Sequence, residues 1–146
     1  MNAWASLMLI AGGLFAGGAV TFEWSRVPIW RRMPVREFIG DFEETLRRTD
    51  KVQPALLVVA IVSAAGFALT AEGPARVLAS VGAAGFVATL AASIALLVPL
   101  QRRIVATPPE EAKAIDKMRA RWFRGHLGRS MLGAASFAAV AVAATL

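Results

Sequence analysis

The chain has 146 residues, of which 57% are hydrophobic, and it carries a formal net charge of +6. It contains no cysteine, which excludes disulfides, thiolate metal sites and a cysteine nucleophile. Its apolar residues gather in charge-free runs over 3–22, 52–71, 77–101 and 130–146, a pattern typical of an integral membrane protein. We therefore predict a single all-α domain, 1–146, folded as a membrane four-helix bundle with an extra amphipathic interfacial helix.

The expected spans cover 3–23, 52–71, 77–100 and 126–146, and they differ in one respect. The last charge-free run has only 17 residues, whereas a helix needs about 20 residues to cross a bilayer. The membrane boundary must then fall near Leu127, with His126 and Arg129 at or just inside it. Ionisable groups at that depth usually face the interior of a bundle and a partner, so function is expected there.

Basic residues divide unevenly among the connections between spans. Seven Lys or Arg residues lie between the first two spans and eight between the last two, whereas Arg76 alone lies in the middle connection. Because basic loops stay on the cytoplasmic side, both long loops are predicted to be cytoplasmic and both termini outside the cell membrane. The basic residues are therefore expected to face the lipid bilayer, and no binding of nucleic acid is expected.

The first long loop contains two features of interest. Glu23, Arg26 and Trp30 have helical spacing, and Glu23 lies at the depth inferred for His126. We therefore expect Glu23 to pair with His126 or Arg129, or else locally with Arg26. Further on, residues 34–49 form an amphipathic pattern that begins at Pro34 and is too polar to span. This helix is expected to lie flat in the headgroup region, the alternative being a lid over the bundle.

Three further signals mark helix ends. Asp50 and Gln53 have capping-box spacing before the second span. Pro99 removes a backbone donor and exposes a carbonyl one turn earlier, which can bend the third span and shape a cavity. The segment from Thr107 to Glu110 predicts a last helix that begins near Pro108.

The last helix carries Arg119, Trp122, His126 and Arg129 on a single stripe. A histidine can act as a base near neutral pH, and an arginine can stabilise an oxyanion. Trp122 and Trp30 can stack on a flat ring. Two alternatives remain: the stripe anchors helices at the membrane interface, or His126 ligates haem or a single metal.

Four segments resemble a known family: GGLFAGGAVTFEWSRVPIW (12–30), DKVQPALL (50–57), LLVPLQRRI (96–104) and RARWFRGHLGRSML (119–132). They are similar to the anthrone-oxygenase-like family of small four-span membrane proteins, largely a domain family of unknown function. The resemblance implies a four-helix membrane bundle. It also implies oxidation of anthrone-type polyketides to quinones by O2 without a tightly bound cofactor, with Trp122, His126 and Arg129 as site residues. The family usually has asparagine where this chain has Gln101.

Two hypotheses follow. In the first, the protein is an oxygenase-like enzyme for a lipophilic phenolic or anthrone-type substrate, with His126, Arg129 and Glu23 in catalysis and no cofactor. The substrate would then contact four further side chains: Trp122, Trp30, Arg26 and Gln101. In the second, the protein is a non-catalytic subunit of a larger complex or a binder of lipophilic small molecules. A homo-oligomer is compatible with both hypotheses.

Overall fold

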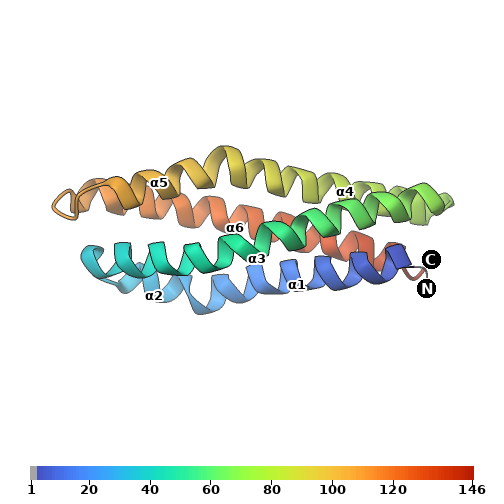
Figure 1. Cartoon of the computed structure of the whole chain (residues 1–146), viewed down its shortest axis with the longest axis horizontal. Coiled ribbons are helices and arrows are strands. Elements are labelled where there is room, and N and C mark those ends of the chain that lie inside the picture. The colour runs from blue at the N-terminus through green and yellow to red at the C-terminus, as the bar shows by residue number, and fades with distance from the viewer. Residues whose placement is uncertain (1–2) are drawn as a thin grey trace.

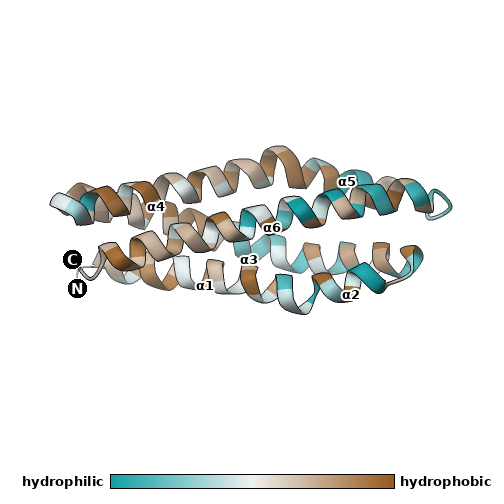
Figure 2. Ribbon diagram, turned by 180° about the vertical axis from the view of Figure 1, so that it is seen from behind, coloured by the Kyte–Doolittle hydropathy of each residue, from teal (hydrophilic) through white to brown (hydrophobic). Residues whose placement is uncertain are grey.

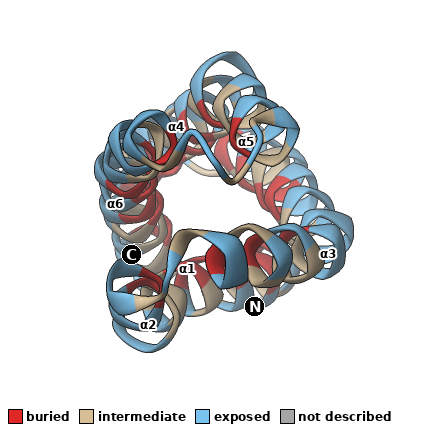
Figure 3. Cartoon of the chain, turned by 90° about the vertical axis from the view of Figure 1, so that its left-hand side faces the viewer, coloured by how far each residue is buried: buried red, intermediate tan, exposed pale blue. Residues whose placement is uncertain are grey.

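A computed structural model of the protein describes residues 3–146, and every element within that range is a helix. The helices form long antiparallel rods, with the N- and C-termini at one end and both long connections at the other (Figure 1). The elements are α1 (Ala3–Ser25), α2 (Val27–Arg32), α3 (Val35–Thr70), α4 (Gly73–Ala92), the π-helical turn η1 (Ser93–Leu97), α5 (Val98–Ala106) and α6 (Ala112–Ala143). Viewed along the bundle, the rods surround a common axis and their buried residues face inward (Figure 3).

Three of these rods, Ala3–Arg32, Val35–Thr70 and Gly73–Ala106, are long and apolar enough to cross a membrane. Figure 2 shows that hydrophobic residues dominate toward the termini and hydrophilic residues toward the opposite end. Helix α6 is not one of the three within the described residues. Because α6 ends at Ala143, any segment of it that is long enough to span must include both His126 and Arg129.

Helix α3 overturns the predicted division between an amphipathic helix over 34–49 and a span over 52–71. A single helix runs from Val35 to Thr70, and Pro54 lies inside it. Asp50 therefore does not begin a helix, as its capping-box spacing had indicated. An interior proline removes one backbone hydrogen bond, and membrane helices tolerate this loss when neighbouring helices hold them in place.

The apolar stripe of the amphipathic segment provides such contacts. Phe38 and Phe42 are fully buried, and both rings contact Trp30. This part of α3 consequently packs on the bundle, and the expectation that it lies flat on the membrane is wrong. We call the buried residues here the aromatic cluster: Val27, Trp30, Phe38, Phe42, Leu46, Leu97, Ile104, Ile115, Trp122 and Phe123.

A second buried group lies toward the chain termini. We call it the terminal cluster, and it comprises Met8, Ala11, Phe15, Leu57, Ala60, Ala64, Phe86 and Val140. Glycines bring α4 and α6 close together beside it. A Cβ atom on Gly82 would lie 2.9 Å from the carbonyl oxygen of Ser136, so that position has no room for a side chain.

The distortion expected near Pro99 is present one turn before it. The N–H of Val98 donates to the carbonyl of Ser93, which widens the helix into η1. Proline cannot donate to the carbonyl of Ala95, and the wider turn accommodates that missing hydrogen bond.

The beginning of the last helix differs from the sequence prediction. Helix α6 begins at Ala112 rather than near Pro108. The hydroxyl of Thr107 donates to the Arg103 carbonyl at 2.7 Å, so Thr107 completes α5 instead of capping α6. The N–H of Glu111 then donates to the Pro108 carbonyl and closes a turn between the two helices.

Candidate active site

A cavity of about 510 Å³ lies between the aromatic cluster and the terminal cluster. This volume is within the range of pockets that hold small organic molecules. We call it the central cavity; side chains from α1, α3, α4, η1, α5 and α6 line it, and most of them are apolar. The polar or hydrogen-bonding side chains among them are Thr49, Asp50, Gln53, Ser93, Gln101, Trp122, His126 and Arg129.

The central cavity reaches the surface on one side of the bundle. Asp50 and Pro54 on α3 and Ile94 on η1 line the cavity and are also exposed. These residues belong to two rods, so the opening lies between α3 and η1. It is located beside the widened turn that precedes Pro99.

The expected contact between Glu23 and α6 is present, and His126 makes it. The Nδ1 atom of His126 contacts the Oε1 atom of Glu23, and these side chains are only 7% and 9% exposed, respectively. The hydroxyl of Ser130 lies 3.5 Å from both partners. A carboxylate buried beside a histidine holds the imidazole in one orientation.

The remaining contacts of the imidazole fix its plane. The ring stacks on Trp122 with the centroids 4.6 Å apart, and Phe22 lies 5.1 Å away. In the neutral imidazole, Nδ1 carries the proton when it donates to the Glu23 carboxylate, because a carboxylate only accepts. The Nε2 atom then carries a lone pair, and it has no hydrogen-bond partner among residues 3–146.

Arg129 is the second ionisable group of the cavity wall. Its Nε atom is buried and has no hydrogen-bond partner in the part of the chain that the structure describes. The guanidinium lies 5.4 Å from the centroid of the Phe15 ring. Asp50 and Glu23 are the carboxylates whose charges act on it, but neither forms an ion pair with it among the described residues. Arg129 is consequently free to bind an anionic group within the cavity.

Trp122 and Gln101 also line the cavity. The Trp122 side chain is 1% exposed, and its Nε1 donor is buried without a partner in residues 3–146. The Gln101 side chain interacts with Asp50 at the opening. Buried donors are nearly always hydrogen-bonded in folded proteins, so an unpartnered donor beside a cavity indicates a place for a ligand.

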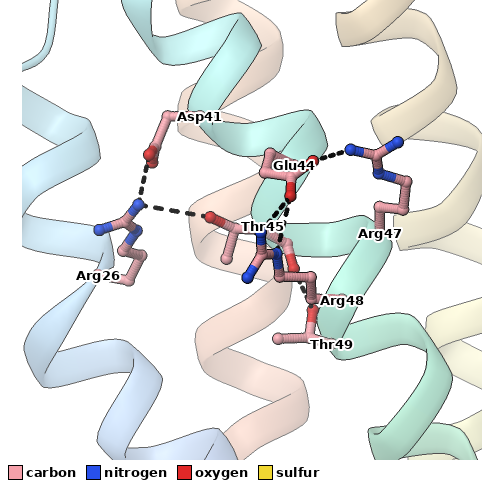
Figure 4. A network of polar contacts seen from close by, with 7 residues as sticks. All are labelled: Arg26, Asp41, Glu44, Thr45, Arg47, Arg48 and Thr49. Atoms are coloured by element: carbon pink, nitrogen blue, oxygen red, sulfur yellow. Dashed lines mark hydrogen bonds and ion pairs between the residues drawn. The ribbon is translucent and has the colours of Figure 1, made fainter.

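The structure does not bring Trp30 or Arg26 to the central cavity. Trp30 is fully buried in the aromatic cluster, and its Nε1 atom donates to Asp41. Arg26 forms an ion pair with the same Asp41 carboxylate and reaches Thr45 at 3.5 Å (Figure 4). Its expected local pairing with Glu23 is therefore not formed. These two residues tie α2 and the end of α1 to α3.

Arg119, the first member of the predicted stripe, also has a role in holding the rods together. Its guanidinium donates to the backbone carbonyls of Trp30 and Met33 at 3.0 and 2.9 Å. These carbonyls lie at the end of α2, where helical acceptors have no intrahelical donor. The arginine thus fastens α6 to α2, away from the cavity lining.

Sequence reasoning missed the contribution of α3 to the cavity. Asp50 and Gln53 have capping-box spacing, which predicted the start of a helix before the second span. In an uninterrupted helix, Leu46, Asp50, Gln53 and Leu57 share one face, and all four line the cavity. That spacing is visible in the sequence once Pro54 is allowed inside the helix.

No group of three or more His, Asp or Glu side chains that could hold a metal ion occurs among residues 3–146. His126, with Glu23 beside it, is the single histidine of the chain. This part of the protein combines a buried imidazole, a partly buried guanidinium and an aromatic wall.

Three apolar rods long enough to span a membrane indicate a helical membrane protein, and ionisable side chains line its central cavity. More specifically, the chain belongs to the anthrone oxygenase family, whose model matches residues 42–139. The resemblance noted in the sequence is thereby confirmed, and an oxygenase-like function is indicated at the level of the family. The matched range includes Trp122, His126 and Arg129. No curated protein and no solved structure matches the chain.

Proposed function

We propose that the protein is a membrane-embedded oxygenase that oxidises a lipophilic phenolic or anthrone-type substrate with O2. The observation that carries the proposal is the position of His126 in the cavity wall, with Nδ1 bound to Glu23 and Nε2 unpartnered among the described residues. A buried carboxylate that orients an imidazole prepares the other ring nitrogen to accept a proton. The apolar walls suit a substrate that dissolves in lipid.

The reaction begins with removal of a proton from the ring CH2 group of an anthrone by Nε2 of His126. The resulting enolate transfers electrons to O2, a C–O bond forms at the same carbon, and the peroxide anion takes up a proton from the protonated His126 to give a hydroperoxide. Loss of water from this hydroperoxide breaks the O–O and remaining C–H bonds and gives the quinone. One anthrone and one O2 thus become one quinone and one water, and the carbanion is the reductant.

Each remaining polar group has a role in this scheme. The Arg129 guanidinium stabilises the enolate oxygen, because a buried cation is available where negative charge develops. Trp122 forms an aromatic wall beside the proton acceptor and offers a free Nε1 donor. Gln101 contributes a polar group near the opening. In this proposal the substrate supplies the electrons itself, so no bound cofactor is required.

Oxygen consumption by purified protein tests the proposal. With an anthrone as substrate, His126→Ala is expected to lower the rate by about 100-fold or more, because general-base catalysis contributes roughly that amount. Arg129→Lys is also expected to lower the rate of oxygen consumption, since lysine keeps the charge but lacks the planar set of N–H donors of a guanidinium. The matched control Arg124→Lys changes an exposed arginine of the same helix and should leave the rate unchanged.

Melting temperatures separate chemistry from folding in this experiment. If His126→Ala and Arg129→Lys both retain full oxygen consumption, the oxygenase assignment is wrong. If wild-type protein binds anthrones without consuming O2, the second hypothesis holds, and the protein is a non-catalytic binder. The cavity volume and its apolar walls support binding in either case.

We also propose that α6 completes a four-span bundle, with both long loops in the cytoplasm and both termini outside. The distribution of arginine and lysine supports this orientation, as does the grouping of both long connections at one end (Figure 1). The absence of native cysteine permits a direct test. Glu72→Cys should react with an impermeant thiol reagent on intact cells, whereas Lys113→Cys should react only after permeabilisation. The reverse pattern would place the site at the outer face.

A further inference from the structure

Gln53 is a polar residue of the cavity wall whose carbonyl group has no evident partner. It lies on α3 beside Pro54, and its Oε1 atom is buried without a hydrogen-bond partner among residues 3–146. Neighbouring Thr49 does not satisfy it, because the Thr49 hydroxyl donates to the backbone carbonyls of Thr45 and Leu46. Buried amide oxygens nearly always accept a hydrogen bond, so this one is available to a ligand.

A glycine on α1 makes room for this amide. A Cβ atom on Gly18 would lie 2.5 Å from the Nε2 atom of Gln53, so a side chain there would require the amide to move. At the preceding Gly17, a Cβ atom would meet nothing within 4 Å. Of these adjacent glycines, only Gly18 is thus needed for space. The end of the Gln53 side chain thus packs against α1 at Gly18.

The cavity wall has unpartnered hydrogen-bond donors on one helix and an unpartnered acceptor on another. Helix α6 contributes donors, the Nε atom of Arg129 and the Nε1 atom of Trp122. Helix α3 contributes the Gln53 acceptor, and apolar side chains such as Phe15 and Leu97 line the space as well. A complementary ligand has an acceptor or anionic oxygen, an apolar ring system and a separate hydroxyl donor.

We propose that Gln53 is a specificity-determining residue that accepts a hydrogen bond from a ring hydroxyl, so that the site selects hydroxylated over unsubstituted aromatic ligands. This inference rests on the proposed function and narrows its substrate class. Arg129 binds the oxygen that becomes the enolate, and Gln53 recognises a second oxygen elsewhere on the rings. Polar groups left unpaired in a buried site discriminate against analogues that lack the matching hydroxyl.

The test measures binding without turnover. Dissociation constants for anthrone, 2-hydroxyanthrone and 3-hydroxyanthrone are measured under nitrogen on the full chain in detergent, by quenching of tryptophan fluorescence. Wild-type protein is expected to bind at least one hydroxylated probe about tenfold more tightly than anthrone, the upper range for one neutral hydrogen bond. Gln53→Met should remove this preference by weakening the hydroxylated probe alone.

Three further variants separate recognition from packing. Gly18→Ala should displace the amide and cause the same selective loss, whereas Gly17→Ala should leave all three affinities unchanged. Gln53→Glu retains an acceptor and should retain the preference. Equal affinities in wild-type protein, absence of binding, or an equal loss for every probe in Gln53→Met would each overturn the inference.

The outcome is independent of oxygen consumption. A hydroxyl preference that depends on Gln53 in a protein that consumes no O2 would contradict the oxygenase proposal and support the recognition role. Oxygen consumption that depends on His126, together with unchanged probe preference in Gln53→Met, would support the oxygenase and overturn the role of Gln53.

Discussion

The two ends of the bundle are packed in different ways. Near the termini, small residues allow close approach of helices, as at Gly82, where α4 meets the backbone of α6. Near the long connections, large rings fill the centre, and Trp30 contacts Phe38, Phe42, Trp122 and Phe123. Close backbones leave little space, whereas rings hold helices apart, so the comparison indicates why a cavity forms where the two kinds of packing meet.

The cavity lining supports this interpretation. Phe15 and Leu57 belong to the terminal cluster, whereas Leu46, Leu97 and Trp122 belong to the aromatic cluster, and all five line the central cavity. The site is thus located at a change of packing and not within either cluster.

The largest expected effect comes from removing the ring at the centre of the aromatic cluster. Trp30→Ala should destabilise the protein by about 3–5 kcal/mol, because it deletes a fully buried side chain and leaves Asp41 without its indole donor. Thermal unfolding in detergent, followed by circular dichroism, measures the change. Trp24, which is 81% exposed, provides the control, and Trp24→Ala should lower the Tm much less. Equal shifts would show that the cluster does not stabilise this end.

An intermediate effect is expected at the close contact of the terminal half. Gly82→Ala should destabilise by about 1–3 kcal/mol, because its Cβ atom would lie 2.4 Å from Val140 and 2.9 Å from the Ser136 carbonyl oxygen. Gly17→Ala, in open space, should instead leave the Tm unchanged or raise it slightly, since alanine favours a helix by up to about 1 kcal/mol. The same unfolding measurement compares both variants, and a neutral Gly82→Ala would contradict close packing there.

The smallest effect is expected at the surface of the loop end. Arg36 and Glu110 form an ion pair at 3.0 Å with side chains 75% and 70% exposed. Solvent screens such pairs, so Arg36→Ala should change the stability by less than about 1 kcal/mol. A much larger drop in Tm would mean that this ion pair, rather than the aromatic cluster, holds the loop end together.

The sequence was sufficient to predict the helical class, and it selected as candidates two α6 residues, His126 and Arg129, that line the cavity. Charge-free runs identified the apolar segments, and the short last run pointed to His126 and Arg129. The depth argument also identified Glu23 as a partner, because Glu23 and His126 are about equally far along the chain from the two termini, which share one end of the bundle. The family resemblance, carried by the same α6 motif, is now shown over residues 42–139.

Short sequence motifs gave wrong predictions where contacts between helices determine the structure. Pro54 and Asp50 have the appearance of a helix start, yet α3 continues through both because its flanking turns are held by the bundle. For the same reason, the sequence could not assign Trp30 to the aromatic cluster rather than to a ligand. In the sequence, an aromatic residue near a charged one is compatible with a packed cluster and with a ligand site. Only contacts between segments distant in the chain distinguish these two environments.

The single histidine of the chain makes the site unusually accessible to magnetic resonance. Protein labelled with nitrogen-15 only in histidine would give signals from one imidazole, that of His126. The Nδ1 resonance would report the bond to Glu23, and the Nε2 resonance would report whatever occupies the cavity. A native residue thus provides a probe of protonation and occupancy at the centre of the bundle, without any introduced label.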